Sequence, residues 1–110
     1  MVSLIEKNKN AIVALCKKHQ VKSLYAFGSA VRDNDFTRNS DIDLLADFNN
    51  QPHLENAEEL LHYFENLDML NYELENLFNR HVDLLTEKNI RNKYLKEIIN
   101  SEKQLIYAQA

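Results

Sequence analysis

The stretch that decides the fold is DIDLLADF, residues 41–48. Apolar residues occupy every second position along it, while Asp41, Asp43 and Asp47 fall on the opposite face. This period of two predicts a β-strand with one face in the core. Because side chains two residues apart on a strand point the same way, the carboxylates of Asp41 and Asp43 stand side by side.

The two neighbouring carboxylates indicate a cation site. Like charges on a half-buried face repel each other and are costly to desolvate without a cation. Carboxylate oxygens suit Mg²⁺, which takes one or two carboxylates together with substrate phosphates. Asp83 lies in a second apolar stretch, VDLL, and on a neighbouring strand it completes a set able to hold two metals ~3.5–4 Å apart. Acids on the solvated face of an edge strand are the alternative interpretation.

Gly28 is the one glycine of the chain, and it follows an apolar run at residues 23–27. A glycine kept at the end of a buried strand indicates a positive φ or a close approach to the backbone. A phosphate is the natural candidate, because the turn leads into a short helix whose N–H groups bind anions, and Ser29 adds a hydroxyl. A plain strand-to-helix turn remains the alternative.

The rest of the chain predicts a small mixed domain. Helical spacing predicts helices at 3–19, 54–79 and 88–101, and strand patterns fall at 23–27, 41–48 and 81–86. The first helix opens on a capping box, Asn66-Leu67-Asp68 is a candidate break in the second, and residues 29–40 form a helical turn and a loop. The order α-β-β-α-β-α predicts an α+β (mixed α/β) fold with a three- to four-stranded sheet. At 110 residues we expect one domain, residues 1–110.

Composition excludes several classes of partner. Thirteen basic against seventeen acidic residues give a net charge of −4 with no basic block, so we expect no direct nucleic-acid binding. No apolar run is long enough for a membrane span, and the start lacks the features of a signal peptide. One cysteine, Cys16, excludes an internal disulfide and is expected to be buried. We therefore expect a cytoplasmic protein.

The remaining polar candidates are expected to lie outside the site. His19, His53, His62 and His81 have no close metal-ligand spacing, and we expect them to be solvated. His81 precedes the third strand, so an approach to the site is the alternative for it. Asp47 shares a face with the acid pair but sits further along the strand, so we expect it to be exposed.

Two motifs together resemble a known family. YAFGSAVR at residues 25–32, followed by SDIDLL at residues 40–45, resembles the Gly-Ser…Asp-x-Asp signature of the polymerase-β-like nucleotidyltransferases. The short chain and VDLLT at 82–86 are similar to the minimal branch, the MNT domains, and the tail at 90–107 extends the likeness. The resemblance implies the nucleotidyltransferase fold.

By this resemblance, the triphosphate is held by Gly28 and Ser29. Asp41 and Asp43 bind both metals, and Asp83 acts on the metal nearest the acceptor.

Arg32 and Ser40 complete the nucleotide-binding set that the resemblance implies. Arg32 matches an arginine four residues after the glycine that contacts phosphate, although a surface arginine is an equal interpretation. Ser40 precedes the first aspartate and shapes its turn. Many members carry glycine where this chain has Asp33, which leaves the backbone less free there.

The resemblance also implies a function. The expected reaction is transfer of an NMP moiety to a hydroxyl of a partner protein, with ATP as donor and two Mg²⁺ ions. Many MNT domains are antitoxins paired with HEPN-type toxins, so we expect such a toxin as partner in a hetero-oligomer. The alternatives are a binding module that neutralises its partner by contact alone and a transferase acting on a small molecule such as an aminoglycoside.

Overall fold

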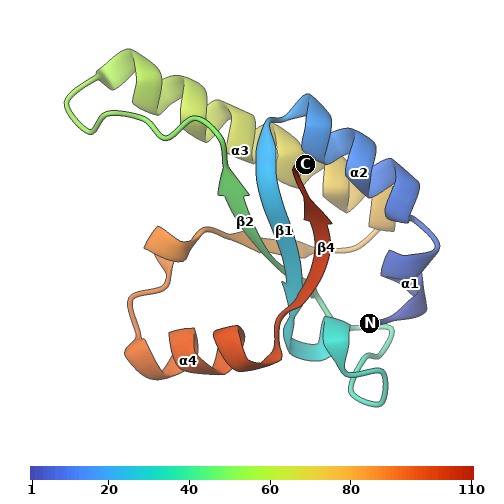
Figure 1. The fold of residues 1–110 in the computed structure, drawn as a ribbon. Helices are drawn as coiled ribbons and strands as arrows, with labels where there is room; N and C mark the ends of the chain where they lie inside the picture. The colour runs from blue at the N-terminus through green and yellow to red at the C-terminus, as the bar shows by residue number, and fades with distance from the viewer.

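The computed structural model describes residues 1–110 and is built around one four-stranded sheet with the strand order β3-β2-β1-β4 (Figure 1). Its elements in chain order are α1 (Ser3–Glu6), α2 (Lys9–Lys18), β1 (Val21–Phe27), the 3₁₀ turn η1 (Gly28–Val31), β2 (Ile42–Phe48), α3 (Ala57–Phe78), β3 (Val82–Leu85), the 3₁₀ turn η2 (Glu87–Asn89), α4 (Lys93–Glu102) and β4 (Gln104–Ala108). β1 pairs antiparallel with β2 and β4, whereas β2 and β3 run parallel. The mixed sheet with its helices confirms the predicted α+β class.

The main core lies between the sheet and the helices α2 and α3 (Figure 1). Ile42, Leu44 and Ala46 of β2 are all buried there, as the alternating pattern predicted. Cys16 of α2 and Leu74 of α3 are buried in the same cluster, so the prediction for the cysteine is confirmed.

On the opposite face of the sheet, α4 packs against one end (Figure 1). Ile99 of this helix and Ile90 form a second buried cluster with Phe27 and Leu45. β2 is therefore packed on both faces along its middle. Its polar residues are left at the two ends, with the acid pair at the start and Asp47 near the finish.

The predicted helix over 3–19 is wrong in one respect, because it is split into α1 and α2. The Asn8 side chain donates to the Leu4 carbonyl at 2.8 Å. In a continuous helix this carbonyl would accept the backbone N–H of Asn8, so the side chain replaces a helical hydrogen bond. The predicted capping box is also wrong, since the N-cap is Val2 and makes no side-chain bond.

The second predicted helix begins three residues later than expected and is not interrupted. Asn56 caps α3 by accepting the Glu59 N–H at 3.0 Å, and the helix ends at Asn79 in the left-handed conformation. Asn66 does not break the helix. Its side-chain amide hydrogen-bonds to His19, the residue that follows α2, and not to the backbone of α3 itself. None of the helices combines the length and apolar character needed to cross a bilayer.

The tail contains a helix and the fourth strand. Asn92 caps α4 by accepting the N–H groups of Tyr94 and Leu95, so the helix begins five residues later than predicted. β4 then pairs with β1 and buries Ile106. The sequence pattern had assigned no strand to this segment.

Candidate active site

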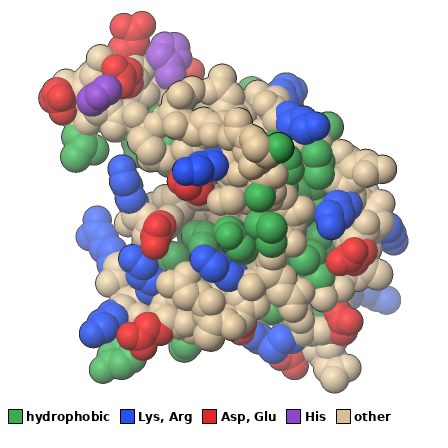
Figure 2. Space-filling model, in the orientation of Figure 1, with side chains coloured by type: hydrophobic (Ala, Val, Ile, Leu, Met, Phe, Trp, Pro, Cys, Tyr) green, Lys and Arg blue, Asp and Glu red, His purple; other side chains and the backbone are tan.

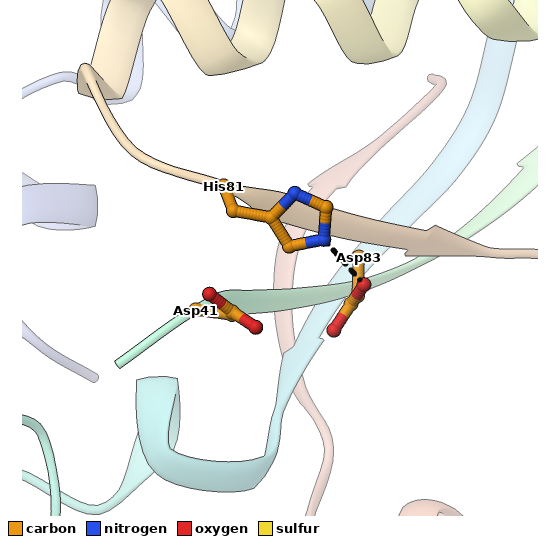
Figure 3. Close-up of side chains that lie close together, drawn as sticks. All are labelled: Asp41, His81 and Asp83. Carbon is orange, nitrogen blue, oxygen red and sulfur yellow. Dashed lines mark hydrogen bonds and ion pairs between the residues drawn. The ribbon is translucent and has the colours of Figure 1, made fainter. Parts of the chain in front are cut away.

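The three predicted acidic residues meet at one end of the sheet. Asp43 lies directly opposite Asp83 in the parallel β2–β3 pair, so both side chains leave the same face. Asp41 stands just before β2, and its carboxylate points toward Asp83 (Figure 3). Asp43 lies on β2, an inner strand of the sheet, whereas Asp83 lies on the edge strand β3, and the side chains of Asp41 and Asp83 are exposed.

Asp43 is the member of the cluster whose ionisation is most perturbed. Burial, a hydrogen bond to Asp83 and the negative charges of Asp83, Asp41 and Glu102 together raise the pKa of Asp43 from 3.8 to about 6. Each of these causes disfavours the charged form. A cation bound at the cluster would therefore lower its free energy.

The residues present fit a divalent metal. One ligand atom each from Asp41, His81 and Asp83 lie within 4.8 Å of one another. Asp43 is outside that group but is hydrogen-bonded to Asp83. The Asp83 side chain is 47% exposed, so water and substrate phosphates have access. Several carboxylate oxygens in such a place match the preference of Mg²⁺.

His81 borders the cluster, and its side chain is 58% exposed, so the prediction that it is solvated is confirmed. Its Nε2 lies 2.9 Å from Asp83 Oδ1, and its Nδ1 lies 3.0 Å from Glu75 Oε2 on α3 (Figure 3 shows the first contact). The hydrogen bond to Asp83 is the main cause that raises the pKa of His81. The signal was available in the sequence, because His81 and Asp83 are two residues apart and share a face, as Asp41 and Asp43 do.

Gly28 has both features that its position predicted, a positive φ and a close approach of another group to its backbone. Its φ is +65°, a conformation that residues with a Cβ rarely adopt. A Cβ on Gly28 would stand 2.5 Å from Asp43 Oδ2. The turn therefore approaches the acidic cluster so closely that any side chain would displace the Asp43 carboxylate.

A carboxylate from α4 occupies the same turn. The Gly28 N–H donates to Glu102 Oε1 at 2.8 Å, and Arg32 Nη1 donates to Glu102 Oε2. Arg32 Nε donates in turn to Asp35 Oδ2 at 2.7 Å. The side chain of Ser29 is partly exposed, and its hydroxyl makes no hydrogen bond within the protein. Sequence reasoning missed Glu102, because nothing local marks a residue 74 positions from its partner.

The loop before Asp41 is held by Arg80. Its Nη1 donates to the carbonyls of Thr37 and Ser40 at 3.0 and 2.8 Å, and its guanidinium lies over the Phe36 ring. The Ser40 hydroxyl accepts the Thr37 N–H at 2.9 Å and so lies within the loop. These contacts fix the chain that delivers Asp41 to the cluster.

The other polar residues divide between surface and core. Asp47 is exposed, as predicted. The prediction for His19 is wrong: it is 5% exposed and bonded by Asn66 at Nδ1 and by Glu73 at Nε2, 2.7 Å each.

A hollow of about 310 Å³ lies beside Leu45 and is lined by Lys88 and Lys103. Basic side chains gather in this part of the surface, between α3 and α4 (Figure 2).

This fold, with clustered carboxylates beside a glycine turn, defines enzymes that move a nucleotide from a nucleoside triphosphate to an acceptor. Comparison with protein families agrees with that class. The nucleotidyltransferase domain matches residues 9–106, and the chain belongs to this family. Membership implies a nucleotide donor and a metal.

Several proteins of Methanocaldococcus jannaschii are similar in sequence. Two of them, provisionally named protein adenylyltransferases, are each 39% identical to this chain. The matches cover 82% of this chain and 79% of the first relative, and 84% and 82% for the second.

Solved structures share the nucleotidyltransferase fold. One described as a minimal nucleotidyltransferase has a TM-score of 0.68 at 24% identity, covering 94% of this chain and 95% of the other. A toxin–antitoxin complex with AMP-PNP gives 0.67 at 19% identity and covers 93% and 74%. A tri-AMPylated HEPN toxin of Shewanella oneidensis bound to its MNT antitoxin gives 0.61 at 16% identity and covers 94% and 72%.

Proposed function

We propose that the protein transfers AMP from ATP to a hydroxyl group of a partner protein, with Mg²⁺ as the metal. The observation that carries this proposal is the register of β2 and β3, which sets Asp43 opposite Asp83 and next to Asp41. The archaeal relatives that are provisionally named protein adenylyltransferases support the choice of AMP and of a protein acceptor.

The metal-binding residues that we propose are the carboxylates of Asp41, Asp43 and Asp83. Together they would hold the two Mg²⁺ ions, with Asp83 on the acceptor side. When bound, the ions would lower the pKa of the attacking hydroxyl and neutralise the charge of the leaving pyrophosphate. His81 keeps the Asp83 carboxylate turned toward the cluster through its 2.9 Å contact.

The triphosphate would bind at the turn that follows β1. The Ser29 hydroxyl has no partner within the protein and donates to a phosphate oxygen. Arg32 adds positive charge beside it. Ser40, bonded to Thr37, keeps the neighbouring loop in place.

The reaction is a displacement at phosphorus. The acceptor oxygen bonds to the α-phosphorus of ATP while the bond from that phosphorus to the oxygen bridging to the β-phosphate breaks. The products are an AMP ester, pyrophosphate and one proton. Because ATP is the donor, the reaction belongs in the cytoplasm.

The partner that we propose is a HEPN-type toxin, modified on a tyrosine hydroxyl, so that this chain acts as its antitoxin in a hetero-oligomer. The toxin–antitoxin complex with AMP-PNP and the tri-AMPylated HEPN toxin bound to an MNT antitoxin support this choice, because both share the fold.

The test is transfer to a partner protein. The protein is purified with its interacting partner and incubated with ATP and Mg²⁺, and the intact mass of the partner is measured. We expect a gain of one or more AMP units, lost in the double variant Asp41→Asn/Asp43→Asn. Asp47→Asn is the matched control, because Asp47 lies on the same strand but is exposed and outside the cluster.

The other outcomes identify the rival functions. Full neutralisation of the partner by the double variant, with no gain in mass, would indicate neutralisation by contact alone. Transfer of AMP to an aminoglycoside, with no modification of any protein, would indicate a small-molecule transferase.

A further inference from the structure

Glu102, the last residue of α4, connects two groups at the phosphate end of the site. One carboxylate oxygen accepts the Gly28 N–H at 2.8 Å, and the other accepts Arg32 Nη1. The Glu102 side chain is 23% exposed, so it is largely withdrawn from water. Hydrogen bonds between ions of opposite charge are among the strongest in proteins, and shielding from water strengthens them further.

The remaining donors of Arg32 are left available. Asp35 takes Nε and Glu102 takes Nη1, so neither bond uses Nη2. An arginine presents five N–H donors in a rigid plane. Two carboxylates therefore hold the plane in place while its Nη2 hydrogens remain free to meet an anion.

We propose that Glu102 is a positioning residue for the phosphates of the nucleotide, an inference that rests on the proposed function. Acting through Arg32 and the Gly28 turn, it fixes the distance between the guanidinium and the turn before the triphosphate arrives. A free arginine side chain loses rotamer entropy when it is ordered. Since Glu102 and Asp35 have already ordered Arg32, nucleotide binding does not bear that cost.

The same contacts would have the opposite effect if Glu102 were a competitor. A carboxylate that occupied the place of a phosphate would have to leave before the nucleotide could bind, and its removal would tighten binding. Positioning predicts that its removal weakens binding. The sign of the change in affinity therefore distinguishes the two roles.

The test measures binding of phosphate chains without turnover. Titration calorimetry gives the Kd of Mg²⁺-tripolyphosphate, Mg²⁺-ATP and AMP for the wild type, Glu102→Ala and Glu102→Gln. For Glu102→Ala we expect Kd to rise about tenfold, equivalent to ~1.4 kcal/mol, for both triphosphates and to stay unchanged for AMP. Glu102→Gln keeps an acceptor for the Gly28 N–H and loses the charge, so it should fall in between.

Glu97→Ala is the matched control, because Glu97 lies on the same helix, is exposed and makes no ion pair. Its three Kd values should equal those of the wild type. An equal loss for AMP and tripolyphosphate in the Glu102 variants would mean that Glu102 only supports the fold. Unchanged or tighter tripolyphosphate binding would also overturn positioning, and should Glu102→Ala fail to fold, Glu102→Gln decides the sign.

The fate of the proposed function is judged separately. If the wild type modifies its partner while the Glu102 variants bind tripolyphosphate normally, positioning is wrong and the proposed function stands. If the wild type binds neither triphosphate and transfers no AMP, both are wrong.

Discussion

Gly28 is required both by the backbone conformation of its turn and by the position of the Asp43 carboxylate. Its φ of +65° and the 2.5 Å that would separate a Cβ from Asp43 Oδ2 are two independent constraints on one residue. The first concerns the stability of the turn, and the second concerns the position of a carboxylate. They can be separated experimentally.

Gly28→Ala should reduce activity more than it reduces stability. A positive φ costs an alanine about 1–2 kcal/mol, which denaturant unfolding measures. The added Cβ also displaces the Asp43 carboxylate, so AMP transfer should fall by roughly tenfold or more even when the protein is fully folded. Gln20→Ala is the control, because it places alanine at a φ of 59° just before β1, at the end of that strand away from Gly28. Equal activities of the two variants would contradict the close approach.

Asp43→Asn should stabilise the metal-free protein at neutral pH. The pKa of Asp43 is raised to about 6 from 3.8, so the folded state binds more protons than the unfolded state between those values, and stability falls as pH rises through this window. Asparagine carries no charge at any of these pH values, so the variant does not lose stability in this way as pH rises. In EDTA, the Tm of Asp43→Asn should exceed that of the wild type at pH 7 and match it at pH 4. Asp47→Asn should show no such gain, and a lower Tm for Asp43→Asn at pH 7 would contradict the repulsion.

At the level of elements, the strands that carry the site were predictable. β1, β2 and β3 lie within two residues of their predicted bounds, because alternation and buried apolar runs are local signals. β4 was not predictable, since a short segment after a helix becomes a strand only when β1 offers it an edge. The acidic cluster followed from strand geometry, whereas Glu102 joins the site through a contact that no local pattern encodes.

The uninterrupted α3 likewise depends on a distant contact. The Asn66 amide donates to the His19 carbonyl at 2.8 Å and lies 2.7 Å from the buried His19 ring. Asn66→Ala should lower the free energy of unfolding by about 1–3 kcal/mol, because it leaves buried polar groups without partners. Asn76→Ala, at an exposed position of the same helix, should be neutral or stabilising, since alanine favours helices. Stabilisation by both changes, measured by urea unfolding, would contradict the role of Asn66.

For the whole molecule, one physical arrangement underlies the function. The core between the sheet and α2 and α3 sets the register of β2 and β3, and α4 packs on one end of the other face, next to the glycine turn. Carboxylates from two strands therefore converge where a phosphate chain can reach them. The chain retains an unfavourable cluster of like charges there, which a bound cation would stabilise.

The most direct measurement is the anomalous scattering of Mn²⁺ in crystals of the protein grown with a non-hydrolysable ATP analogue. We predict two metal peaks among Asp41, Asp43 and Asp83, with the triphosphate beside Gly28 and Ser29. Peaks elsewhere, or no ordered metal at these carboxylates in the presence of bound nucleotide, would contradict the assignment.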